Sequence, residues 1–150
     1  MIDASTKAEA AKRFAADFEA AFRRRQALAT RPHRFRQRDY VVSLGSTLAL
    51  PIAPAPVKIR LSYVPDRLVL DRDCFEPYLA RLAAEPWTGI EEAMTAFLGD
   101  IANEVVPFWA HLSATTRIKS DGDDDSHTIA MEDRQPNWDN PDLLARFDRA

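Results

Sequence analysis

The sequence has few of the residues that mark disulfide-linked proteins and phosphate-binding loops. Its 150 residues include four glycines and one cysteine, Cys74. The glycines are not grouped, which excludes a glycine-rich phosphate loop. A lone cysteine excludes an internal disulfide and a multi-cysteine zinc site, and no other metal site is indicated.

Long apolar segments are also missing. No run approaches the ~20 apolar residues that cross a bilayer. The first residues lack the basic-then-apolar order of a signal peptide. We therefore expect a cytoplasmic protein that has no membrane partner. Hydrophobic residues make up 46% of the chain and charged residues 29%, which is typical of a globular domain with a core of its own.

Charge is unevenly distributed along the chain. The net charge of −3 argues against a general nucleic-acid binder. Arginines nevertheless gather in one stretch, at Arg23, Arg24, Arg25, Arg31, Arg34, Arg36 and Arg38. This stretch could contact phosphate or RNA, but we favour a solvated helix end, where cations complement the helix dipole. The acidic residues Asp121, Asp123, Asp124 and Asp125 do not follow EF-hand spacing and are expected in a hairpin loop.

Residues 1–32 are expected to form an N-terminal helix. Thr6 to Glu9 is a capping-box pattern, and Phe14, Phe18 and Phe22 recur every four residues. This apolar stripe is interpreted as a packing surface. The helix should end before Pro32, because the residue before a proline avoids the helical conformation.

Residues 38–133 predict an α+β domain in the order strand, strand, helix, helix, strand, strand. Residues 57–63 alternate apolar and polar side chains most clearly, as a half-buried strand does. The helices are expected over 71–84 and 88–106, and the last strands over 108–118 and 128–132. The tail, 134–150, carries apolar residues and is expected to dock as a short helix.

Candidate catalytic residues are scattered. His33 lies in the arginine-rich segment and is expected to be exposed, whereas His111 and His127 lie on neighbouring strands and could face each other. Cys74 follows Asp73 in the first turn of a helix, where its thiol pKa could be depressed. We favour burial of Cys74 as a small hydrophobe.

One stretch resembles a known family. Tyr63-Val64-Pro65-Asp66, then Asp71, then Tyr78-Leu79 is similar to the pattern of the 7-cyano-7-deazaguanine (nitrile) reductases of queuosine biosynthesis. The resemblance covers about residues 40 to 118. It implies a tunnelling fold (T-fold), an antiparallel sheet with helices on one face. It also implies homo-oligomers in which subunits join side by side and bind heterocycles at their interfaces.

The chain departs from this family at the catalytic positions. The family's cysteine nucleophile falls at Leu48, and its catalytic histidine at Ile90 or Glu91. The Lys-Ser pair that follows the family's substrate-binding glutamate is here Arg72-Asp73. A covalent thioimide cannot form on leucine.

Asp71 occupies the position of the family's substrate-binding glutamate. A carboxylate there would accept two hydrogen bonds from a purine- or pterin-like ring, with Arg72 beside it, although Asp71 could equally be only a helix N-cap. The resemblance thus implies a heterocycle-binding protein. If it is an enzyme, catalysis would use acid–base groups, His111, Glu91 or Glu92. The alternatives are an inactive scaffold or partner subunit of the same fold and RNA binding through Arg23–Arg38. The sequence indicates no cofactor.

Overall fold

The structure is a computed structural model that describes residues 4–120 and 123–148. In chain order the elements are α1 (Ala4–Gln26), β1 (Thr30–Pro32), β2 (Val42–Leu48), β3 (Val57–Val64), β4 (Leu68–Leu70), the 3₁₀ turn η1 (Arg72–Cys74), α2 (Phe75–Ala83), α3 (Ile90–Glu104), β5 (Trp109–Ser120), β6 (Asp123–Arg134) and α4 (Pro141–Asp148). Of the expected acidic loop, Asp121 lies outside the described residues, whereas Asp123, Asp124 and Asp125 belong to β6. None of the helices in the described ranges is long and apolar enough to cross a membrane.

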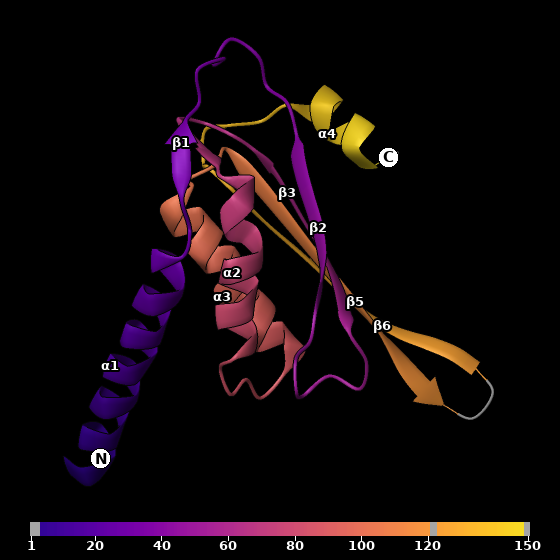
Figure 1. The fold of residues 1–150 in the computed structure, drawn as a ribbon. Helices are drawn as coiled ribbons and strands as arrows, with labels where there is room; N and C mark the ends of the chain where they lie inside the picture. The colour runs from indigo at the N-terminus through magenta and orange to yellow at the C-terminus, as the bar shows by residue number, and fades with distance from the viewer. Residues whose placement is uncertain (1–3, 121–122, 149–150) are drawn as a thin grey trace.

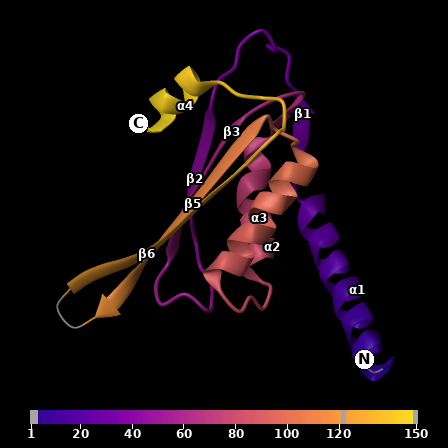
Figure 2. The same cartoon turned by 180° about the vertical axis from the view of Figure 1, so that it is seen from behind.

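The main sheet confirms the predicted element order. Its four strands run β2-β3-β5-β6, and each neighbouring pair is antiparallel. Helices α2 and α3 come between β3 and β5 in sequence and lie together on one face of this sheet (Figures 1 and 2). The chain is therefore an α+β protein with an additional N-terminal helix, as predicted.

The two faces of the sheet differ because side chains alternate along each strand. Leu61 and its partner Leu112 lie on the helix-covered face and are fully buried. The opposite face carries polar residues such as the paired Arg60 and Ser113. Helix α4 lies on this second face (Figures 1 and 2), where Phe147 packs edge-on against Trp109, with ring centroids 5.0 Å apart. The tail therefore docks as a short helix, as predicted.

Helix α1 ends earlier than its sequence predicts. It stops at Gln26, and residues 30–32 form β1, which pairs antiparallel with β4. The helix thus ends before Pro32, as expected, but the assignment of residues 30–32 to the N-terminal helix is wrong because their backbone is used for strand pairing. Arg31 lies opposite Val69, and the Asp71 backbone N–H donates to the Ala29 carbonyl at 2.8 Å.

The apolar stripe of α1 is not packed within this chain. Phe14, Phe18 and Phe22 are 74%, 63% and 57% exposed, so their interpretation as packing residues is wrong for the single chain. The reason is the direction of the helix. Its N-terminal part points away from α2, α3 and the sheet in both views (Figures 1 and 2), and only its last turns meet the body of the protein.

The attachment of α1 depends on a buried carboxylate, Asp100 of α3. Its oxygens accept hydrogen bonds from Arg24 Nε at 2.8 Å, Arg25 Nε at 2.8 Å and the Tyr78 hydroxyl. Arg24 also donates from NH1 to both carboxylate oxygens of Glu85, at 2.9 and 2.7 Å. These contacts join α1 to α3 and to the segment that follows α2, and Tyr78 joins α2 to the same carboxylate.

Burial and charge act together on the ionisable groups of this network. Burial alone would lower the pKa of Arg24, but its bonds to Asp100 and Glu85 outweigh that effect and raise it. Burial, followed by the nearby Asp100 charge, raises the pKa of the Tyr78 hydroxyl. Arg24 therefore stays charged and Tyr78 stays protonated at neutral pH. The expectation of a solvated arginine stretch is wrong for Arg24, which is buried, and for Arg25, which is half-buried.

We predict that Asp100→Ala lowers the free energy of unfolding by about 3–5 kcal/mol, because removal of one partner leaves a buried charge unpaired. Urea unfolding followed by circular dichroism measures this loss. Asp133→Ala, at an exposed position of β6, is the matched control and should change the value by less than about 0.5 kcal/mol. Equal stabilities of the two variants would contradict the importance of the network.

Candidate functional site

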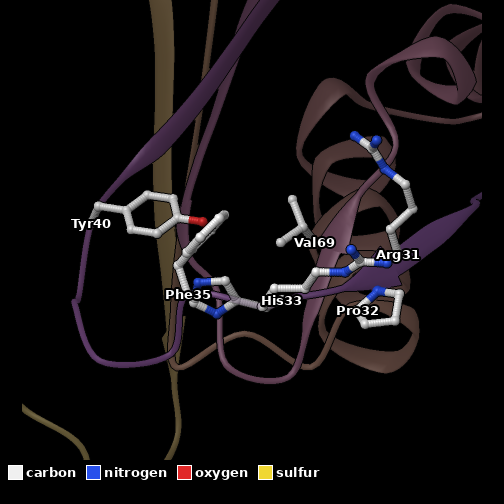
Figure 3. A pocket seen from close by; sticks show the side chains of 7 residues that line it. Arg31, Pro32, His33, Phe35, Tyr40 and Val69 are labelled. Atoms are coloured by element: carbon white, nitrogen blue, oxygen red, sulfur yellow. The ribbon is translucent and has the colours of Figure 1, made fainter.

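A cavity of about 560 Å³ lies where the segment after β1 passes β4. Its lining residues are Arg31, Pro32, His33, Arg34, Phe35, Tyr40 and Val69. In Figure 3 the rings of His33, Phe35 and Tyr40 gather on one side, Arg31 lies on the other, and Val69 lies between them. A volume of this size is within the range of small-molecule sites. We call this cavity the β1–β4 pocket.

His33 is the most buried polar residue of the β1–β4 pocket. It is 5% exposed, so the expectation that it is exposed is wrong. Its backbone N–H donates to the Arg67 carbonyl at 2.8 Å, and its ring meets the Tyr40 ring edge-on at 5.3 Å. These contacts hold the segment after β1 against the turn before β4, which encloses the ring.

The two ring nitrogens of His33 have different surroundings. Nδ1 lies 2.8 Å from the carbonyl oxygen of Asp66. Because a carbonyl only accepts, Nδ1 carries the proton and Nε2 is the free position of the neutral ring. Among the described residues Nε2 has no hydrogen-bond partner although it is buried. An unsatisfied buried polar atom costs about 1–3 kcal/mol, so a ligand that supplied the partner would recover this energy.

Two of the remaining arginines of the stretch belong to the β1–β4 pocket. Arg31 and Arg34 line it and are exposed. Asp66, in the turn before β4, is already engaged, since its Oδ1 lies 3.5 Å from Arg36 and its Oδ2 accepts from Gln135 Nε2 at 3.1 Å. The pocket wall therefore carries positive charge beside aromatic rings.

Asp71 follows β4, two residues after Val69 of the pocket wall. Its backbone is extended (φ −71°, ψ 118°), and its Oδ1 accepts from the Asp73 backbone N–H at 3.2 Å. The capping role is therefore confirmed. The side chain is half-buried, and its Oδ2 has no partner within the described part of the chain, so one oxygen remains for a ligand. Arg72 beside it is exposed.

The two candidate glutamates lie in the first turn of α3. Glu92 accepts from the backbone N–H of Thr88 at 2.9 Å and from its hydroxyl at 2.5 Å. These bonds lower the pKa of Glu92. Glu91 Oε1 lies 3.0 Å from His127 Nε2. Each glutamate is thus already engaged, Glu91 with His127 and Glu92 with Thr88.

His111 lies in a different environment from the glutamates. It is on the polar face of the sheet, between Trp109 and Phe147, at centroid distances of 5.8 and 5.5 Å. His127 pairs with Thr116 and so lies on the opposite face, which makes the expectation that His111 and His127 face each other wrong. No described contact joins His111 to Glu91, and their joint catalytic role stays a prediction.

Sequence reasoning missed the β1–β4 pocket. From the sequence, the arginines between Arg23 and Arg38 were considered only for their charge. The signal that could have found it is the aromatic residues interleaved with them, Phe35 and Tyr40. No group of three or more histidine, cysteine, aspartate or glutamate side chains suited to a metal ion occurs in residues 4–120 and 123–148.

Comparison with known proteins adds no assignment. The sequence matches no protein-family model and no curated protein. The resemblance to the nitrile reductases therefore stays a prediction.

Cys74 provides a direct test of local structure. It is buried, as expected, and its thiol donates to the Asp71 carbonyl at 2.9 Å. We predict that iodoacetamide alkylates native Cys74 at least about tenfold more slowly than the urea-unfolded chain, because buried thiols are inert. Mass spectrometry over time measures the two rates. Rapid labelling of the native protein would show instead that the turn around η1 opens.

Proposed function

We propose that this protein binds a purine- or pterin-like heterocycle beside Asp71. The observation that carries the proposal is a half-buried carboxylate with an unpartnered oxygen, Oδ2, two residues along the chain from Val69 of the β1–β4 pocket. Such an oxygen can accept from the N–H edge of a heterocycle. The pocket wall adjoining it offers the rings of Phe35 and Tyr40 to the ligand's faces.

The location at a subunit interface is part of the same proposal. Strands β2 and β6 are the outer strands of the main sheet. Their outward backbone N–H and C=O groups are available for pairing with another chain. Side-by-side joining of subunits through these edges would produce the homo-oligomer that the family resemblance implies.

The contacts favour a binding role over covalent chemistry. Leu48, at the family's cysteine position, is 3% exposed within the core. Cys74 is buried beneath the Asp71 turn. If a reaction occurs, it would use acid–base groups rather than a nucleophile. An inactive scaffold of the same fold is the second candidate, and it is favoured by the structural partners of Glu91 and Glu92.

We predict that Asp71→Asn weakens heterocycle binding at least about tenfold, since a charge-assisted hydrogen bond is worth about 1.5–3 kcal/mol. Asparagine keeps a capping oxygen, so η1 should remain intact. Titration calorimetry with a panel of pterins and deazapurines measures the dissociation constants. Asp73→Asn, in the same turn, is the control and should bind as the parent protein does. Binding by none of the panel, or unchanged binding by Asp71→Asn, would favour the scaffold.

A further inference from the structure

We infer that the ligand of the β1–β4 pocket carries an anionic group, a phosphate or carboxylate, and that Arg31 and Arg34 receive it. The inference rests on the proposed heterocycle site and names the chemical class of its ligand. The first observation is the positive charge of the pocket wall. Arg31 and Arg34 both line the pocket, and neither has a hydrogen-bond or ion-pair partner among the described residues.

His33 contributes an acceptor that the rest of the ligand would satisfy. With Nδ1 donating to the Asp66 carbonyl, the neutral ring presents the lone pair of Nε2. A ring N–H or a hydroxyl of the ligand would supply the donor that Nε2 lacks. The pocket is therefore matched by an anionic group at the two unpaired arginines and by a hydrogen-bond donor at His33.

The dimensions of the site place the two ends of the ligand. Arg31 lies directly opposite Val69 in the β1–β4 pairing, and Asp71 lies two residues further along the extended chain. Two residues of extended backbone span about 6.6 Å. A planar ring held at Asp71 would then have its anionic substituent at Arg31. Phe35, which is 74% exposed at the pocket, would cover the ring.

The test compares matched ligands that differ only in the anion. Calorimetry is run with guanosine and its 5′-monophosphate, and with neopterin and its monophosphate. We expect the phosphorylated member of at least one pair to bind tenfold or more tightly, and Arg31→Gln to abolish that preference. Arg38→Gln, exposed in the same segment but outside the pocket lining, is the control and should keep it.

A separate titration with pyrophosphate distinguishes the two proposals. Arg31-dependent pyrophosphate binding without any heterocycle binding would uphold the anion site and overturn the proposed function. Equal affinity for both members of each pair would overturn the anion site and leave the heterocycle site standing. Absence of all binding would overturn both.

A second observation, the exposed stripe of α1, leads independently to a partner. We propose that α1 pairs antiparallel with α1 of a second copy of this chain. Phe14, Phe18 and Phe22 form one exposed face on a helix that points away from the body of the protein. Such a helix gains most of its stability from packing an apolar face.

Charge on the two flanks of the stripe selects the antiparallel direction. At about 100° per residue, Lys12 and Glu19 fall on one flank and Arg13 and Asp17 on the other. In an antiparallel pair with Phe14 opposite Phe18 of the second copy, each flank of one helix lies against the same flank of the other helix. The two flanks run in opposite directions. Lys12 then faces Glu19, and Arg13 faces Asp17. A parallel arrangement would instead bring like charges together.

We predict that Phe18→Asp halves the number of chains in the assembly, measured by light scattering after gel filtration. Lys12→Glu should do the same, and Lys12→Glu combined with Glu19→Lys should restore the parental mass, because the pairs are re-formed with reversed sign. Glu9→Lys, on the far face of α1, is the control. A mass that Phe18→Asp leaves unchanged would overturn the pairing and assign the stripe to another partner.

Discussion

The carboxylate of Asp100 is fully buried, and the arrangement of the N-terminal third of the chain depends on satisfying it. Water cannot reach this group, so its charge has to be balanced by donors from the protein. Tyr78 supplies one donor from α2, and Arg24 and Arg25 supply the others from the last turns of α1. The position of α1 is therefore determined mainly by polar contacts of its last turns, to Asp100 and to Glu85, since the apolar stripe of the helix lies elsewhere.

This attachment also positions the β1–β4 pocket. Because Arg24 and Arg25 hold the end of α1, the chain leaves the helix beside β4, and Arg31 can pair with Val69. The next residues fold back across the turn at Asp66, where His33 is enclosed. The pocket is thus formed by a segment that the ββααββ unit alone does not contain. A ligand that contacted both this segment and Asp71 would therefore bridge the added N-terminal part of the chain and the ββααββ unit.

Local patterns predicted the elements of the sheet and its helices well, because burial on one face imposes its own period on each strand or helix. Residues 57–61 alternate in burial as expected, whereas Ser62 is buried as well as Tyr63. The patterns failed where contacts between distant residues decide the outcome. Nothing local distinguishes Arg24, buried against Asp100, from exposed Arg23. Nor does the sequence around His33 reveal that Asp66, 33 residues away, will enclose it. The same limitation applies to α1, whose periodicity predicts a packing face but not which chain covers it.

The burial and the existing bonds of several side chains support the proposed binding role over covalent chemistry. A cysteine placed at Leu48 would lie in the core, where burial raises the pKa of a thiol and opposes formation of the nucleophilic thiolate. Glu91 and Glu92 are held by His127 and Thr88. Asp71 differs from all of these, since its capping bond uses one oxygen and leaves the other for a ligand.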